Sequence, residues 1–176
     1  SIKPRPYSLV FCGDGSQGGE ENLEEQRQIK ETTRLALKHG WEPSNFTSRE
    51  SLSIRKNILN AFKNKSIKSL VAIKCLDEGV DIPSCETAFL LASSSNPRQF
   101  IQRRGRILRR SPGKDKAIIY DFLVHTSGNV DDKYSKRLIR RELERISEFS
   151  KYALNSHENY ISIKPILIKY GLVHLI

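Results

Sequence analysis

The sequence predicts an α/β domain of three layers, in which helices cover both faces of a mostly parallel sheet. Short apolar runs alternate along the chain with segments whose apolar residues recur every three or four positions. Runs that are apolar throughout are typical of strands buried on both faces of a sheet, and intervening helices favour parallel connections. The length of 176 residues suits one domain, since about 100–200 residues per domain is usual.

The first strand and helix lie in the first forty residues. Residues 7–12 (YSLVFC) form an apolar run that predicts a buried strand. Residues 20–39 predict a helix, which Gly40 ends. One face of this helix carries Ile29, Thr33, Ala36 and Leu37.

A short strand, a helix and a buried strand are expected next. Residues 45–47 predict the short strand, and Thr47 and Glu50 stand at the spacing of a capping box. The helix that follows has Ile54, Ile58, Ala61 and Phe62 at helical spacing. Residues 69–73 (SLVAI) predict the buried strand.

The second half of the chain continues the alternation and then becomes helical. Residues 87–92 and 117–122 predict two more buried strands, and residues 97–104 predict a helix between them. Residues 131–153 predict a long amphipathic helix with Ile139, Leu143, Ile146 and Ala153 on one face, and the last twenty residues predict another helix. We therefore expect an α/β domain over residues 1–124, with residues 125–176 as a helical extension packed on it.

Charge is distributed unevenly along the chain. The formal net charge is +10. Residues 13–31 carry six acids and two bases, whereas residues 98–116 carry eight bases and one acid. A basic excess concentrated in one segment indicates a polyanionic partner, first of all nucleic acid. The three cysteines form no CxxC pair, and no apolar run is long enough to span a membrane. We expect no metal site, no membrane association and a reducing, cytoplasmic location.

The segment after the strand 69–73 carries the first candidate site. Residues 74–83 read KCLDEGVDIP, which places Asp81 at the carboxyl end of a strand, where ligands of parallel sheets bind. A carboxylate at this position can accept hydrogen bonds from ribose hydroxyls. The alternative is a plain turn, in which Gly79 adopts a positive φ and Asp81 caps the turn.

A second candidate site follows the strand 87–92. Residues 102–110 read QRRGRILRR, and a separation of three places Arg106 and Arg109 on one face of a helix. Two guanidinium groups on one face can hold the oxygens of a phosphoryl group during its transfer. The alternative is a solvated basic helix, or a patch that holds phosphates without any catalytic role.

Together the two segments resemble motifs V and VI of superfamily-2 helicases and translocases. Residues 79–83 (GVDIP) are similar to motif V, and residues 102–109 (QRRGRILR) are similar to motif VI. Residues 7–12 resemble motif IV, and residues 46–50 (FTSRE) resemble the segment called IVa. The resemblance, which extends over residues 7–122, implies the second RecA-like domain of such a motor. Its motif V is more similar to DNA translocases of the repair and restriction type, including DEAD/DEAH members, than to RNA-acting DEAD-box proteins.

The resemblance implies a role for each matching residue. Arg106 and Arg109 would be arginine fingers that reach the γ-phosphate of ATP. Gln102 would lie near the nucleotide, Asp81 would contact its ribose, and Gly79 would allow the close approach. The cofactor would be ATP with Mg2+, held mainly by an N-terminal RecA-like domain of the same protein.

The resemblance also implies a nucleic-acid surface, with DNA favoured over RNA. Thr47, Ser48 and Lys74 would contact the phosphate backbone, because hydroxyl and ammonium groups donate hydrogen bonds to phosphate. One departure affects this surface: Ile73 stands where many relatives have a threonine. An isoleucine has no hydroxyl group, so the charged Lys74 would have to supply the phosphate contact.

The 176 residues contain no GxxxxGK[ST] pattern, so they include no P-loop to hold the β- and γ-phosphates. We therefore expect the chain to be one half of a motor and to be inactive in ATP hydrolysis by itself. Two other interpretations remain open: a non-enzymatic basic module that binds nucleic acid, and a regulatory domain with a helicase-like fold.

Overall fold

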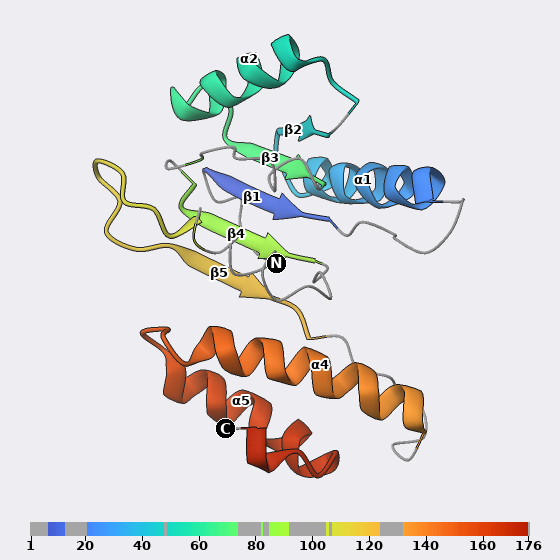
Figure 1. Ribbon diagram of the computed structural model, residues 1–176. Helices are drawn as coiled ribbons and strands as arrows, with labels where there is room; N and C mark the ends of the chain where they lie inside the picture. Colours follow the sequence, from blue (N-terminus) through green and yellow to red (C-terminus); the bar gives the residue numbers. More distant parts are fainter. Residues whose placement is uncertain are drawn as a thin grey trace. The chain divides into compact units, whose positions relative to one another are not determined.

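The computed structural model of the chain describes residues 7–12, 21–47, 49–73, 82, 85–91, 105, 107–123 and 132–175, with only the backbone at 21–25. The chain divides into two compact units, Ser1–Phe122 and Leu123–Ile176 (Figure 1). Each unit has helices that the sequence predicts. The predicted helix at 97–104 lies outside the described residues.

The first unit is built on a five-stranded sheet in the order β2-β3-β1-β4-β5. Its strands are β1 (Ser8–Phe11), β2 (Pro43–Phe46), β3 (Ser69–Ala72), β4 (Thr87–Leu90) and β5 (Ile118–Asp121). All four pairings between these strands are parallel. This confirms the predicted α/β class and the strands on which it rested.

Parallel register aligns the side chains into two apolar faces. Val10 stands opposite Val71 and Phe89 on one face, where all three are buried together with Cys12 and Ile73. The half-buried Ile29 and Trp41 pack against this cluster. Leu9 and Leu70 are opposite one another on the second face, and both are at most 1% exposed. Because both faces are covered, the strands need no polar alternation.

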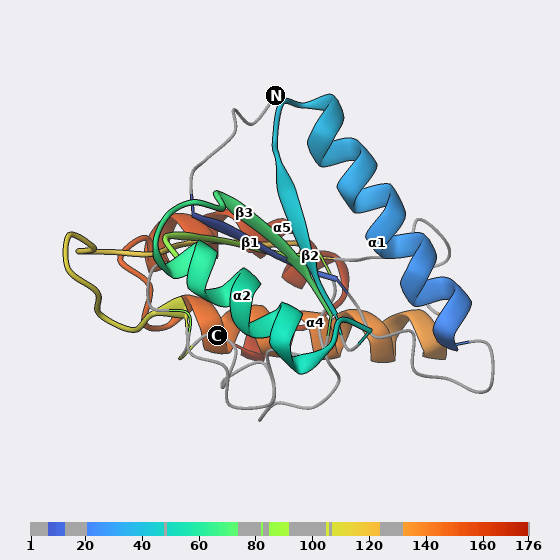
Figure 2. The same ribbon diagram turned by 90° about the horizontal axis from the view of Figure 1, so that it is seen from above.

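Helices α1 (Glu21–Lys38) and α2 (Leu52–Lys63) lie on opposite sides of this sheet (Figure 2). Helix α1 lies over β2 and β3 and presents the half-buried Ile29, Thr33 and Ala36. The prediction that Leu37 shares the buried face is wrong, since Leu37 is 57% exposed. It lies further round the helix than the other three, beyond the narrow stripe that one sheet edge covers.

The described part of the second unit contains α4 (Lys133–Ser150), α5 (Ser156–Lys169) and a 3-10 turn at Val173–Leu175. A buried cluster holds it together, with Ile139, Leu143 and Ile146 from α4, Ile163 and Leu167 from α5, and Tyr170. Asp132 caps α4, because its Oδ2 accepts from the Ser135 N–H at 2.8 Å. The same oxygen accepts from the Ser135 hydroxyl at 2.9 Å, and these two hydrogen bonds lower the pKa of the Asp132 carboxyl. Both predicted helices are confirmed, although Ala153 lies beyond the end of α4.

Candidate functional site

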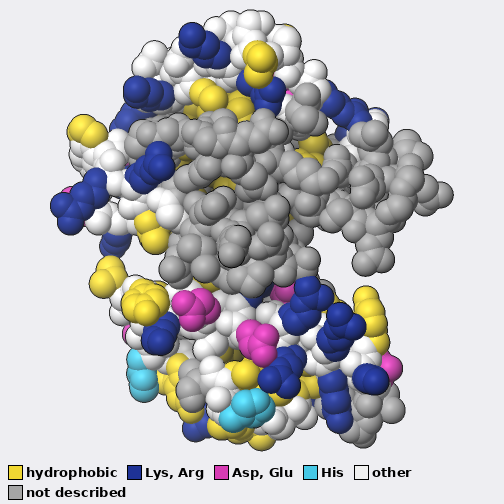
Figure 3. Space-filling model, in the orientation of Figure 1, with side chains coloured by type: hydrophobic (Ala, Val, Ile, Leu, Met, Phe, Trp, Pro, Cys, Tyr) yellow, Lys and Arg dark blue, Asp and Glu magenta, His cyan; other side chains and the backbone are white. Residues whose placement is uncertain are grey.

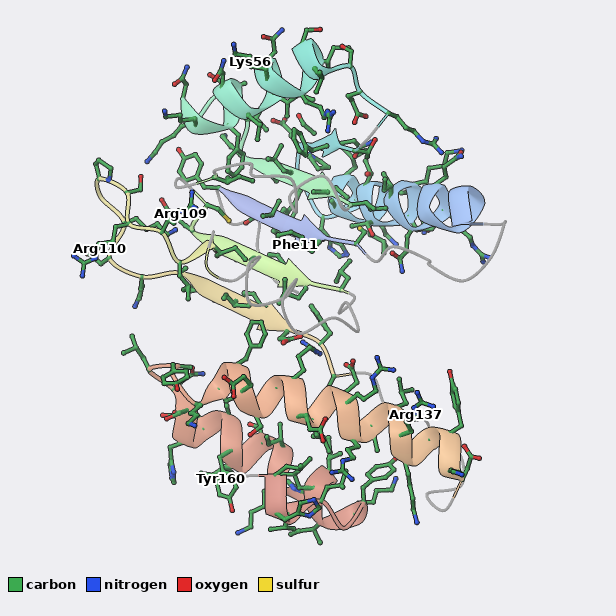
Figure 4. All side chains as sticks on the ribbon, viewed as in Figure 1. Phe11, Lys56, Arg109, Arg110, Arg137 and Tyr160 are labelled. Carbon is green, nitrogen blue, oxygen red and sulfur yellow. The ribbon has the colours of Figure 1, made fainter. Side chains whose placement is uncertain are left out.

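The chain crosses from the carboxyl edge of the sheet to its amino edge between β4 and β5. It must do so because β5 is parallel to β4, and the arginine-rich segment lies on this crossing. Ile107 is 1% exposed and fixes the segment to the core. Arg109 and Arg110 are exposed, and Figure 4 shows both on the side where the strands begin.

Lys114 holds the end of this segment in place. The chain turns at Gly113, whose φ is +77°, and Ser111 and Lys114 form an antiparallel bridge across the turn. The Lys114 Nζ then donates hydrogen bonds to the Ile107 carbonyl oxygen and, at 3.1 Å, to that of Arg109. A cation at the carbonyl end of a helical turn is favourable. Lys114 therefore fixes the backbone that carries Arg109.

Sequence reasoning missed the role of Lys114 and counted it only as one more base. The signal was its position after the turn sequence SPG at 111–113. Burial lowers the pKa of the Lys114 amine, while the nearby Cys85 and Glu86 act to raise it. Cys85 and Glu86 directly precede β4, so Lys114 connects the arginine segment to the amino edge of the sheet.

Thr47 lies at the opposite edge, immediately after β2, and is 6% exposed. Its hydroxyl donates to Glu50 Oε2 at 2.7 Å, and its N–H donates to the same oxygen at 2.6 Å. The Thr47 hydroxyl also accepts from the Arg49 N–H at 3.2 Å. The predicted pairing of Thr47 with Glu50 is confirmed, but α2 begins later, at Leu52, with Ser51 as its cap.

The structure describes two of the eight predicted site residues, Thr47 and Arg109, and places them at opposite edges of the sheet. The hydroxyl proton of Thr47 is directed at a carboxylate, whereas the side chain of Arg109 is exposed. Six predicted residues lie outside the described part of the chain: Arg106, Gln102, Gly79, Asp81, Ser48 and Lys74.

Cys85 makes the stability of the first unit sensitive to high pH. Burial raises the pKa of this thiol from 9.0 to about 12. Above about pH 9 the unfolded chain loses a proton that the folded chain keeps, so stability falls as pH rises toward 12, by up to about 1.4 kcal/mol per pH unit. Cys85→Ser should reduce this dependence and leave the part that comes from the buried Cys12, whose pKa is also raised by burial, because serine does not ionise in that range and its hydroxyl can still donate to the Thr87 carbonyl oxygen. Urea unfolding from about pH 8 to about pH 10 measures the difference, and equal slopes for both proteins would refute it.

The described residues form neither a metal-binding cluster nor a membrane-spanning helix. No three His, Cys, Asp or Glu side chains there lie close enough together to hold a metal ion. In the same part of the chain, no helix is both long and apolar enough to cross a membrane.

Comparisons with known proteins match the part of the chain that contains the candidate site residues. The model of the helicase conserved C-terminal domain family matches residues 9–111. The DNA 3'-5' translocase XPB2 of Sulfurisphaera tokodaii is 40% identical over 88 residues, which are 50% of this chain and 19% of the translocase. Putative helicase 22 of a Sulfolobus islandicus filamentous virus is 34% identical over 79 residues, which are 45% of this chain and 14% of the viral protein. The chain thus spans less than a fifth of the length of these relatives.

The fold is also that of a solved protein. The crystal structure of the yeast DEAD-box splicing factor Prp28 matches 97% of this chain and 32% of its own, with a TM-score of 0.61 and 16% identity. At that identity the likeness concerns the fold, which is RecA-like. The segment matched by the family model includes both Thr47 and the arginine segment up to Ser111.

Proposed function

Because the chain belongs to the helicase conserved C-terminal domain family, we propose that it is the second RecA-like half of an ATP-driven translocase or helicase. The observation that carries the proposal is the arginine segment within the family match, which the buried Ile107 fixes to the core while Arg109 is exposed.

Arg106 and Arg109 act as arginine fingers in this proposal. ATP with Mg2+, held mainly by an N-terminal RecA-like domain of the same protein, supplies the phosphoryl group to be transferred. Guanidinium groups suit its oxygens, because they are always charged and donate several hydrogen bonds. The hydrogen bond from Lys114 to the Arg109 carbonyl supports the role, since a finger must be held before the charge develops. Gln102, Gly79 and Asp81 complete the nucleotide side, with Asp81 on the ribose.

The nucleic-acid side of the proposal depends on Lys74 and Ser48 more than on Thr47. The Thr47 hydroxyl donates to Glu50, so it would have to leave that carboxylate before donating to a phosphate. DNA is favoured over RNA, which the 40% identity to a protein named as a DNA translocase supports. Thr47 and Arg109 lie at opposite edges of the sheet, so in this proposal a phosphate contact made by Arg109 would be coupled through the sheet to a strand held near Thr47.

The proposal is tested by comparing the chain alone with the chain joined to its N-terminal RecA-like half. The chain alone should show no ATP turnover above buffer, because it contains no P-loop. The joined protein should hydrolyse ATP faster when nucleic acid is added, as a coupled phosphate-release assay measures. Turnover by the chain alone would contradict the proposal, and so would a joined protein whose turnover ignored nucleic acid.

A further inference from the structure

The first half of α4 carries a basic face that lies outside the segment matched by the helicase family. Residues 133–141 read KYSKRLIRR and contain no acid. Their five bases are all exposed: Lys133, Lys136, Arg137, Arg140 and Arg141. We call these five residues the basic face of α4. Lysine and arginine side chains gather on the second unit in Figure 3, and Figure 4 labels Arg137 among them.

The packing of the second unit holds this face outward. Ile139, Leu143 and Ile146 are buried against α5 and Tyr170, which fixes the rotation of α4 about its axis. Lys133, Arg137 and Arg141 follow one another at intervals of four residues, so they form a row along the opposite side. The row is therefore presented by a rigid helix and not by a loop.

Ion pairs among the described residues neutralise only part of this charge. Arg140 pairs with Glu144 at 2.9 Å. Among the described residues, Lys133, Arg137 and Arg141 form no ion pair. Glu144 and Glu148 lie in the second half of the helix, beyond the basic residues.

The placement of these bases opposes the stability of the helix. Like charges four residues apart repel each other, and cations are unfavourable near the positive N-terminal end of a helix. The first turn of α4 contains no acid, so among the described residues at this helix end only the N-cap carboxylate of Asp132 offsets this effect. A basic face that is only solvated gains no stability from having its charges placed in this way. A polyanionic ligand would reduce both the repulsion between the bases and their unfavourable interaction with the helix end.

An exposed aromatic ring beside the row indicates the kind of polyanion. Tyr134 is 73% exposed, and its position lies one turn before Arg137 on the same side of α4. Aromatic rings beside basic residues are the usual platform for single-stranded nucleic acid, because unpaired bases stack on the ring while phosphates contact the cations. The bases of a duplex are already stacked on each other and cannot use such a ring.

We propose that Tyr134 and the basic face of α4 bind single-stranded nucleic acid, as a second contact surface separate from the family segment. The phosphates lie along Lys133, Arg137 and Arg141, and one base stacks on Tyr134. The surface needs neither ATP nor the arginine segment, so it stands or falls independently of the proposed motor function.

The test is fluorescence anisotropy of the 176-residue chain with labelled oligothymidylate and oligouridylate of about fifteen nucleotides. Arg137→Glu with Arg141→Glu should weaken binding of both strands at least about tenfold and reduce the slope of log affinity against log salt by about two. Tyr134→Ala should weaken binding at least about fivefold, whereas Tyr134→Phe should not. If the chain binds one of the two oligonucleotides tenfold or more weakly than the other, the tighter one identifies the preferred sugar–phosphate backbone. That result would still support the proposed surface.

The matched control is Lys164→Glu with Lys169→Glu, which makes the same change of net charge on α5 of the same unit. Its affinity should stay within about twofold of the wild type, and circular dichroism should show that every variant is folded. Equal losses in the two charge-reversal pairs would show that only net charge acts, and would overturn the proposal. A preference for duplex over single strand, or unchanged binding by Tyr134→Ala, would overturn it as well.

Discussion

Replacing Arg109 by alanine in the joined two-domain protein should lower nucleic-acid-stimulated ATP turnover by about 10³-fold or more. An arginine finger stabilises charge that develops on the transferring phosphoryl group, so its loss affects kcat more than the affinity for ATP. Arg106→Ala should have an effect of the same size. Nucleic-acid binding should be nearly unchanged, because both substitutions leave the other bases in place. Steady-state turnover and anisotropy measure the two properties separately.

Arg110→Ala is the matched control for this prediction. Arg110 is the next residue in the chain and is also exposed, so its replacement by alanine removes the same charge. It lies outside the spacing of the two proposed fingers. Its turnover should remain within a few-fold of the wild type. If all three variants lost affinity for nucleic acid alike and kept their turnover, the segment would be a phosphate-binding patch and the alternative binding module would be favoured. Turnover that survived both finger substitutions would rule out the finger assignment.

Phe89→Ala should destabilise the first unit by about 3–5 kcal/mol. Phe89 is 7% exposed, and its ring stacks on Tyr120 with centroids 4.8 Å apart and meets the edge of Trp41 at 5.6 Å. Alanine would remove both ring contacts and leave a cavity between β1, β5 and the residues after α1. The loss is expected to lower the urea midpoint of the unit and to leave its denaturant slope unchanged.

Trp41 reports this unfolding selectively, because it is the one tryptophan of the chain and packs on the cluster that contains Phe89. Leu35→Ala is the matched control, since Leu35 is 47% exposed and its truncation should change stability by no more than about 0.5 kcal/mol. If Phe89→Ala and the wild type had similar urea midpoints, the buried cluster that contains Phe89 would not be the part of the core that stabilises the first unit.

The strands and helices that the structure describes were predictable because each is encoded within its own few residues. The strands at Ser8–Phe11, Ser69–Ala72 and Thr87–Leu90 are apolar throughout, as burial on both faces requires. Helix α4 follows from the spacing of Ile139, Leu143 and Ile146. The two segments that resemble motifs V and VI are also local patterns, and the family match includes both of them.

Tertiary structure alone decided the order of the strands and the surroundings of each candidate residue. No local pattern places Lys114 on the carbonyls of Ile107 and Arg109, or directs the Thr47 hydroxyl to Glu50 instead of solvent. Arg109 and Thr47 lie at opposite edges because parallel strands return the chain to the amino edge before each new strand. The sequence by itself thus determined the elements and the family. Contacts between distant residues determined which side chains are held, which are exposed and which edge each one occupies, because such contacts form only when the whole sheet is assembled.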